Sequence, residues 1–486
     1  MTAPRRSPTF DSTFTRPREA PPMPDPLYAV SPLDGRYAGR TEPLREYASE
    51  AALMRSRTEV EVEYLLTLAD LDATPLSIDD GDRSELRSLY EEFDAEDADL
   101  IKRIETEGAR GYAATNHDVK AIEYFVREGL PEGLDAANWI HFGLTSEDVN
   151  NLAHRLLVRD ALADVIEPAI RDVRNELADL AREHRDVPML ARTHGQPATP
   201  TTFGKEMAVY AGRLADLHAD VRVARQSLAG KLGGASGTYA AHVAAYPDVD
   251  WRSFAREFVE GLGLEFTPLT TQVNPCDDLA RAFHALVRTN NVLLDLELDA
   301  WLYVSDRYLG QEAAEGETGS STMPHKVNPI DFENAEGNLS KANSDLEFLA
   351  TYVTTSRLQR DLSDSTVKRN IGAAFAHCLI GYSKTLDGLG KVVPNEQVMR
   401  EELEDTPEII GEAVQTILRR EGHGDAYERV KALTRGKSVT IEDFHDLFAD
   451  LDVPEDVREE LRALTPAGYT GVADDLVEEL EPEGDE

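Results

Sequence analysis

The chain has 486 residues, which is too long for one small hydrophobic core and predicts two or three domains. Aspartate and glutamate number 91 against 50 lysines and arginines, so the net charge is −41, which argues against the basic surface of a nucleic-acid-binding protein. No apolar run reaches the roughly 18 residues that a membrane-spanning helix needs.

The acidic residues are spread through segments with a helical pattern, whereas acidic disordered tails show blocks of like charge. We interpret this spread as adaptation to a salty, halophilic cytoplasm, where a Debye length of roughly 3 Å at ~1 M salt screens the carboxylates. Cys276 and Cys378 have neither disulfide-framework nor zinc-ligand spacing, and we expect both to fill apolar space. The sequence has no HExxH, EF-hand or strand-associated GxGxxG pattern, so we expect no metal and no cofactor.

The first part of the chain does not have the pattern of a folded element. Residues 1–26 contain several prolines and arginines and lack the apolar stretch of a signal peptide. We expect a disordered extension of a cytoplasmic protein, with Met23 as an alternative start.

A turn-forming segment follows, in which an Asp-Gly pair precedes Arg36 and Tyr37. Helical patterns with acidic outward faces then cover residues 41–68 and 83–106. We expect residues 27–134 to form an N-terminal helical domain.

The segment around His117 has the pattern of a helix start. Thr115 or Asn116 can act as the N-cap, and Asp118 falls in the first turn, where a carboxylate is favoured. Capping alone explains these residue types, but a histidine at a helix start is also well placed to meet an anion.

A second helix-start pattern occurs at Thr145 and Ser146. Either residue can cap a helix that has acids in its first turn. The free N–H groups of such a start can bind a carboxylate. Farther on, residues 231–237 are rich in glycine but lack the ending of a P-loop, so we expect a connection lying over a cleft. Gln272 lies in an extended approach to the next helix.

Long helices are predicted in the middle of the chain. Apolar residues spaced four, three, four and three apart form a bundle seam at Ile166, Ile170, Val173, Leu177 and Leu180. Pro168 predicts a kink in this helix, and a second long helix covers 283–301. Strand signals are scarce. The fold class is therefore all-α, with a central bundle over 135–389 and a C-terminal helical domain over 390–486.

Three polar segments interrupt these helices. Pro197 and Pro200 force a non-helical turn that fixes His194. Residues 319–329 combine a glycine, three hydroxyls, a lysine and two prolines, which suits either a turn-rich surface loop or a stiff site that holds hydroxyls and one ammonium. Residues 357–369 carry four basic groups, which is unusual in so acidic a chain.

The segment 319–329 resembles the hallmark loop of the fumarase/aspartase superfamily, and its continuation over 330–335 resembles the adenylosuccinate lyases. The resemblance runs from about Tyr28 to Val477. It implies a three-domain fold and a homotetramer whose active sites are shared by three chains. It also implies elimination of fumarate from adenylosuccinate, giving AMP, and from the succinylated imidazole ribotide SAICAR, giving AICAR.

The resemblance also implies catalytic roles. Ser320, with Ser321 as the alternative, would be the general base, and His194 the general acid. The ammonium of Lys326 would stabilise negative charge that develops on the substrate carboxylate, since fixed electrostatic groups are usually the largest catalytic contribution. Glu333 would pair with a site histidine.

Further residues match substrate-binding positions of the family. His117 would serve both catalysis and binding. The other matched residues are Arg36, Tyr37, Asn116, Asp118, Thr145, Ser146, Gln272, Ser320, Ser321, Lys326, Asn328, Arg360, Ser365, Thr366 and Arg369. Of these, Arg36 and Tyr37 at one end of the sequence and the group from Arg360 to Arg369 at the other would bind the phosphate and the nucleotide.

Two other interpretations compete with this one. Fumarase, aspartase and argininosuccinate lyase share the loop but need no phosphate site, so Arg36, Arg360 and Arg369 favour the nucleotide substrate. A non-catalytic, crystallin-like protein on the same scaffold is disfavoured, because His194 and the residues of the 319–329 loop all stand in their motifs.

Overall fold

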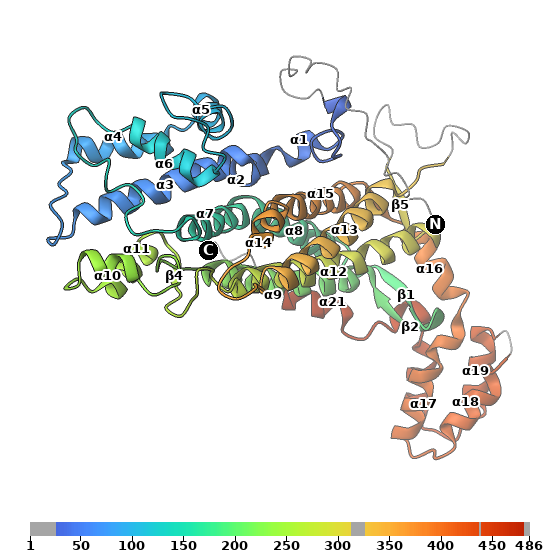
Figure 1. Cartoon of the computed structure of the whole chain (residues 1–486). Coiled ribbons are helices and arrows are strands. Elements are labelled where there is room, and N and C mark those ends of the chain that lie inside the picture. Colours follow the sequence, from blue (N-terminus) through green and yellow to red (C-terminus); the bar gives the residue numbers. More distant parts are fainter. Residues whose placement is uncertain (1–25, 313–325, 437–438, 481–486) are drawn as a thin grey trace, which may run out of the picture.

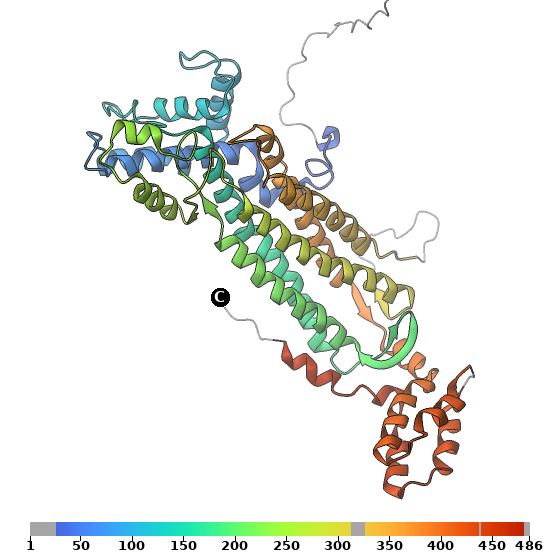
Figure 2. The same ribbon diagram turned by 60° about the horizontal axis from the view of Figure 1, so that its bottom comes forward.

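The structure, a computed structural model, describes residues 26–312, 326–436 and 439–480. Most of these residues are helical, and the long helices lie side by side in one elongated bundle (Figures 1 and 2). The prediction of a mainly α-helical chain around a long-helix bundle is therefore confirmed. Residues 1–25 of the expected extension lie outside the described residues.

A group of helices precedes the bundle; its last four members lie at one end of the bundle, and the first lies alongside the long helices (Figure 1). They are α1 (Ala38–Thr41), α2 (Arg45–Ala48), α3 (Glu50–Ala69), α4 (Asp80–Glu91), α5 (Ala95–Thr106) and α6 (Asp118–Glu128). Helix α3 is buried along much of its length, because α4 and α6 pack on one side and α7 on the other.

The bundle consists of α7 (Ser146–Ala161), α8 (Glu167–Glu183), α9 (Phe203–Gln226), α12 (Asp277–Ser305), α13 (Ile330–Tyr352) and α15 (Ile371–Leu389). A π-helical turn over Leu162–Ile166 joins α7 to α8 immediately before Pro168. Since proline has no N–H and its ring crowds the preceding turn, the wider π turn accommodates it without ending the helix. The predicted seam is confirmed, because all five of its residues from Ile166 to Leu180 are buried.

Shorter elements connect the long helices: α10 (Ala240–Ala245), α11 (Trp251–Gly261) and α14 (Ser363–Lys368). The described residues also form three two-stranded sheets. They pair β1 (Pro188–Thr193) with β2 (Gln196–Thr202), β3 (Ala229–Gly230) with β4 (Glu265–Phe266), and β5 (Leu309–Gln311) with β6 (Val392–Pro394). Both cysteines are buried and unpaired, as expected for apolar fillers.

Beyond the bundle lie α16 (Glu396–Glu404), α17 (Gly411–Arg420), α18 (Ala426–Thr434), α19 (Ile441–Ala449) and α20 (Glu455–Ala463). The last helix, α21 (Ala473–Leu476), packs back against α9. The helices from α17 to α20 surround a separate apolar core that includes Phe444 and Phe448, at the opposite end from α3–α6 (Figure 2). A single continuous core joins the N-terminal helices to the bundle. The predicted domain boundaries at 134/135 and 389/390 stay predictions.

Among the described residues, no helix combines the length and apolar character that crossing a membrane requires. Nor does that part of the chain contain a group of three or more histidine, cysteine or acidic side chains arranged to hold a metal ion.

Candidate active site

The start of α7 holds two residues predicted to bind a carboxylate. Thr145 is the N-cap, with extended backbone, and Ser146 is the first helical residue; both are partly accessible. The backbone N–H of Thr145 donates to Oδ2 of Asp148 at 2.9 Å. The predicted cap followed by a first-turn acid is thus confirmed. The N–H groups at this helix N-terminus favour an anion nearby.

Asp148 also fixes the glycine-rich connection. Its carboxylate is fully buried and accepts from the Lys231 ammonium at 2.7 Å and from the N–H groups of Gly233 and Gly234 at 2.9 and 3.0 Å. These N–H groups are therefore engaged within the protein, which fits the predicted connection and not a phosphate-binding loop.

The same connection positions Gln272, whose Nε2 donates to the carbonyl of Ala235 at 2.9 Å. Gly237 has a positive φ of 71°, and a Cβ at this position would lie 2.4 Å from the carbonyl oxygen of Thr270. Only glycine permits so close an approach, so the connection packs directly onto the Thr270–Gln272 segment.

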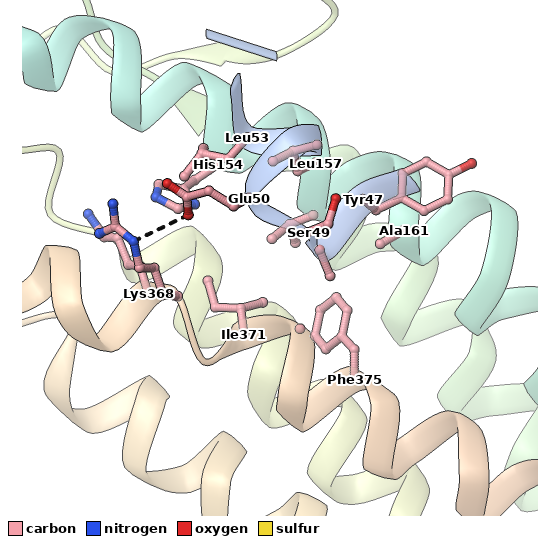
Figure 3. A pocket seen from close by; sticks show the side chains of 14 residues that line it. Tyr47, Ser49, Glu50, Leu53, His154, Leu157, Ala161, Lys368, Ile371 and Phe375 are labelled. Atoms are coloured by element: carbon pink, nitrogen blue, oxygen red, sulfur yellow. Dashed lines mark ion pairs between the residues drawn. The ribbon is translucent and has the colours of Figure 1, made fainter. Parts of the chain in front are cut away.

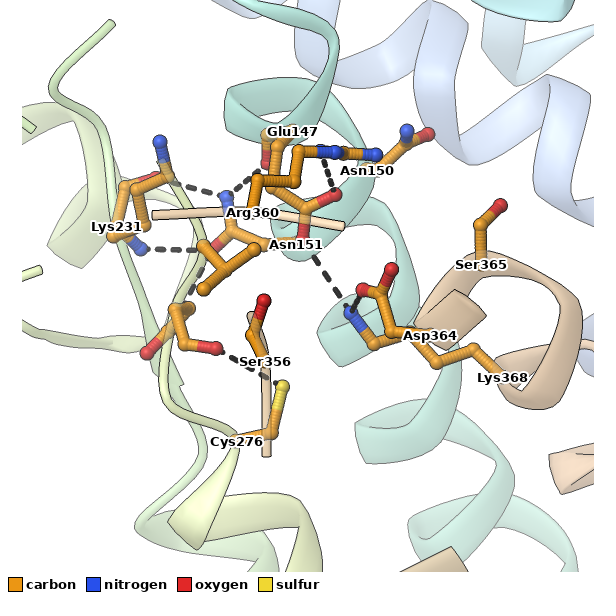
Figure 4. Close-up of polar contacts among 12 residues, drawn as sticks. Glu147, Asn150, Asn151, Lys231, Cys276, Ser356, Arg360, Asp364, Ser365 and Lys368 are labelled. Atoms are coloured by element: carbon orange, nitrogen blue, oxygen red, sulfur yellow. Dashed lines mark hydrogen bonds and ion pairs between the residues drawn. The ribbon is translucent and has the colours of Figure 1, made fainter. Parts of the chain in front are cut away.

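Arg360 also contacts the start of α7. Its Nη1 lies 2.8 Å from Oε2 of Glu147, and Oε1 of the same carboxylate lies 3.4 Å from the ammonium of Lys368 (Figure 4). Lys368 also donates to Asp364 at 2.7 Å. Arg360 and Gln272 line one open cavity of about 480 Å³. Arg360 and Gln272 therefore border one space, and Arg360 also contacts the first turn of α7 through Glu147.

Arg369 and Asp118 connect α14 to the start of α6. Nη2 of Arg369 lies 3.1 Å from Asp118, which also pairs with the buried Arg57 at 2.9 Å. Burial alone would raise the pKa of the Asp118 carboxyl, but the two guanidinium groups and a backbone N–H lower it overall. Nη1 of Arg369 donates to the hydroxyl of Ser365 at 3.0 Å, so this predicted pair is in contact.

The N-cap of α6 is His117, so the prediction of Thr115 or Asn116 as the cap is wrong. Nδ1 of His117 accepts from the N–H of Lys120 at 3.2 Å. Its side chain and those of Asn116 and Thr366 are exposed. Together, the predicted residues at this end of the bundle form what we call the α7 cluster. Its members are Asn116, His117, Asp118, Thr145, Ser146, Gln272, Arg360, Ser365, Thr366 and Arg369.

A second cavity, of about 200 Å³, is lined in part by Arg369 and Lys368. Figure 3 shows this cavity with Lys368 at its wall. Its walls are mostly apolar side chains of α7 and α15, such as Leu157 and Phe375. Nε of Arg369 lies 3.6 Å from Glu50 at its edge. Burial, together with nearby Lys368 and arginines, lowers the pKa of His154 in its wall well below the usual value, so this imidazole is neutral.

Other predicted residues lie at the opposite end of α13 and form the α13 cluster, which consists of Arg36, Tyr37, Lys326, Asn328 and Glu333. Asn334 donates to the Tyr37 hydroxyl at 3.1 Å, and this hydrogen bond lowers the pKa of the phenol. Arg36 and Lys326 are exposed. Oε1 of Glu333 accepts from the indole of Trp301 at 3.3 Å, so within one chain its described partner is not a histidine. Ser320 and Ser321 lie outside the described residues.

His194 occupies the tip of the β1–β2 hairpin, with left-handed backbone and an exposed side chain. The prediction of a non-helical turn is confirmed, but the flanking prolines lie within a paired strand, since Pro197 faces Arg192 and Pro200 faces Leu190. A short ion pair between Arg192 and Glu402 of α16 ties the hairpin to the end of the bundle.

The two clusters are separated by the length of a helix. The α13 cluster surrounds the start of α13, and Arg360 follows its end. A helix of 23 residues at ~1.5 Å per residue spans roughly 35 Å. One chain therefore brings together the α7 cluster but does not bring Lys326 to Arg360.

The sequence profile of the family described as Lyase matches residues 35–343, and that of the adenylosuccinate lyase C-terminal region matches residues 356–470. Curated adenylosuccinate lyases from Legionella pneumophila (strain Corby) and Escherichia coli (strain K12) are both 44% identical to the chain, over 93% of its length and 98% and 99% of theirs. The chain belongs to the adenylosuccinate lyase family. This lyase also shares its fold with solved structures. A fumarate lyase from Mesorhizobium sp. BNC1 and a 3-carboxy-cis,cis-muconate lactonizing enzyme from Pseudomonas putida each have a TM-score of 0.70, at 22% and 23% identity, covering 90% of this chain and 97% and 96% of theirs.

Sequence reasoning missed several residues that are buried in or near the α7 cluster. In the sequence, Glu147 and Asp148 look like ordinary first-turn acids, and Arg57 looks like an ordinary residue within a long helix. His141 was also missed: it has left-handed backbone and lies 2.5 Å from the fully buried Glu61. A usable signal was available only for Asp148, because the cap pattern predicts that this carboxylate turns back toward the helix start.

Proposed function

We propose that this lyase eliminates fumarate from adenylosuccinate, which gives AMP, and from SAICAR, which gives AICAR. The observation that carries the proposal is the cavity lined by Arg360 and Gln272, since Arg360 also contacts Glu147 in the first turn of α7. Its guanidinium and the nearby helix N–H groups suit a ligand with several anionic groups.

The reaction removes a proton from the carbon beside a carboxylate and breaks the C–N bond on the adjacent carbon. We propose that Ser320, or Ser321 in its place, takes the proton as an alkoxide, and that Lys326 and Asn328 stabilise the charge that develops on the carboxylate. The electron pair forms the C=C bond of fumarate while the C–N bond breaks. His194 then gives a proton to the leaving nitrogen as the general acid.

The phosphate distinguishes this substrate from those of other fumarate-releasing enzymes. Arg360, Ser365 and Arg369 lie together in the α7 cluster, and a dianionic phosphate is the partner that such a group favours. The test is a spectrophotometric assay of fumarate release from adenylosuccinate, SAICAR and argininosuccinate at equal concentrations. We expect turnover of the two nucleotides only. Turnover of argininosuccinate at a comparable kcat/KM would contradict the proposal.

We further propose a homotetramer with shared sites. The two clusters lie at opposite ends of α13, so a complete site requires ends of different chains. The bundle also exposes large apolar side chains on α9, α12 and α13, namely Val223, Leu298, Trp301, Leu302 and Phe348. Such a face on a bundle is typical of a subunit interface. Sedimentation equilibrium should give four chains per particle, and an active monomer would contradict this.

The net charge of −41 supports a cytoplasm rich in salt as the site of action. We expect the urea midpoint of unfolding to rise with KCl up to molar concentrations, because screening weakens repulsion between carboxylates. A midpoint that is independent of KCl would contradict this part of the proposal.

A further inference from the structure

Glu147 lies between two elements that are proposed to bind opposite ends of the substrate. It directly follows Ser146 in α7, is only 2% exposed, and contacts Arg360 through Oε2 at 2.8 Å. Residues 147 and 360 are 213 positions apart in the sequence. This one carboxylate therefore links the helix start to the segment that leads into α14 (Figure 4).

The contact uses one edge of the guanidinium and leaves the other available. Glu147 engages Nη1 of Arg360, and within the described part of the chain no hydrogen bond is made by its Nε or Nη2. These two groups form the side edge that binds a phosphate or carboxylate with two parallel hydrogen bonds. Arg360 lines the 480 Å³ cavity, so a ligand that entered this cavity would lie against the Arg360 side chain.

Lys368 balances the charge of Glu147. The buried ammonium lies 3.4 Å from Oε1 of Glu147 and 2.7 Å from Asp364, and both carboxylates are buried. Burial alone would lower the pKa of Lys368, but the neighbouring anionic groups raise it overall, so the ammonium stays charged. With two carboxylates facing two cations, Glu147 orients Arg360 without leaving an uncompensated negative charge against an arriving phosphate.

We propose that Glu147 is a positioning residue that holds Arg360 with its Nε–Nη2 edge toward the phosphate of the substrate. This inference rests on the proposed function, in which Arg360 binds that phosphate. Without this contact, the Arg360 side chain would lose more rotamer freedom on binding the phosphate, and Glu147 restricts that freedom in advance.

The test compares adenylosuccinate with its 5′-dephosphorylated nucleoside in the full-length Glu147→Gln enzyme. For the nucleotide, we expect KM to rise about 10- to 100-fold, the loss typical of a charged hydrogen bond, with kcat changed less than about threefold. For the nucleoside, we expect a change in KM of less than about threefold, because the group that Arg360 binds is absent.

Asp364→Asn is the matched control, because it removes a carboxylate from Lys368 without touching Arg360. It should lower the melting temperature about as much as Glu147→Gln and leave the preference for the phosphate unchanged. An equal rise in KM in both variants would overturn the inference, since the effect would then come from the buried charge alone. Should Glu147→Gln not fold, Glu147→Asp keeps the charge, and an intermediate, phosphate-dependent rise in KM is expected; no rise would again overturn the inference.

Arg360→Ala separates this inference from the proposed function. It should abolish the preference for the nucleotide over the nucleoside. If Arg360→Ala leaves that preference intact, the phosphate assignment of Arg360 fails. If it removes the preference while Glu147→Gln leaves it intact, only the positioning role of Glu147 fails.

Discussion

The α7 cluster and the opposite end of the molecule, which holds the α13 cluster and the His194 hairpin, differ in how their side chains are held. In the first, Glu147 and Asp148 are buried, and their ion pairs and hydrogen bonds fix Arg360 and the glycine-rich connection. In the second, Lys326 and His194 are exposed. The two ends are parts of one proposed site, yet only the first is organised within a single chain.

The comparison indicates that substrate binding and chemistry are divided between the two ends of the molecule. The residues that match phosphate and carboxylate binding lie mostly at the organised end, where fixed partners reduce the entropy lost on binding. The proposed acid and the proposed ammonium lie at the exposed end, where a neighbouring chain would complete their surroundings. Substitutions at the first end should therefore cost more stability than those at the second end, where the main change should be in activity.

The largest expected effect is that of His194→Ala. Loss of the general acid should lower kcat on the order of 10²- to 10⁴-fold. Because the side chain is exposed, the free energy of unfolding should change by less than about 0.5 kcal/mol. Steady-state kinetics and urea unfolding check the two parts. A marked loss of stability would show that the hairpin end is organised as tightly as the α7 cluster.

Asp148→Asn should have the opposite profile. The amide cannot accept from all four donors, and the buried Lys231 loses its counter-charge, so we expect a loss of about 3–5 kcal/mol in the free energy of unfolding. Asp160→Asn on the same helix, at a partly exposed pair with Arg159, is the control and should cost less than about 1 kcal/mol. If urea unfolding gives equal losses for the two variants, the Asp148 carboxylate does not stabilise the fold more than an ordinary surface carboxylate.

A smaller, pH-dependent effect is expected at His141. Burial alone would lower the pKa of its imidazole, but the Glu61 carboxylate raises it overall. Because the folded pKa is raised, the pair stabilises the fold fully below the unfolded pKa of about 6.5 and loses this contribution as pH rises through the folded pKa. The difference in unfolding free energy between the wild type and His141→Gln should therefore shrink above pH ~6.5. A difference that grows with pH would contradict the assignment.

The smallest effect is expected for Tyr37→Phe, which removes the hydrogen bond from Asn334 at the exposed end. The free energy of unfolding should fall by about 0.5–1.5 kcal/mol. Thermal unfolding checks this value, with Asn334→Ala and the double variant completing a cycle. If Tyr37→Phe lowered the free energy of unfolding as much as Asp148→Asn, the two ends would not differ in how tightly their side chains are held.

Local patterns predicted much of this structure. The seam from Ile166 to Leu180, the cap at Thr145 and the non-helical turn at His194 follow from spacing and residue type over a few positions. The proline-containing strand of the hairpin was missed, because Pro197 and Pro200 argue against a strand unless they lie at an edge.

The partners of the site residues could not be predicted. The contact of Glu147 with Arg360 joins residues 213 positions apart, and that of Asp118 with Arg369 joins residues 251 apart. No periodic pattern carries such information, because it depends on how the helices pack. For the same reason, the sequence predicted that residues share a site but not which end of the bundle each occupies.

The most direct test of the central claim is subunit complementation between Lys326→Ala and Arg360→Ala. Each variant alone should have little activity. When the two are dissociated, mixed in equal amounts and reassembled, random pairing gives both native residues to one site in four if the two clusters come from different chains. We predict recovery of about a quarter of wild-type fumarate release. If the mixture stays as inactive as its components, each site lies within one chain and the account is contradicted.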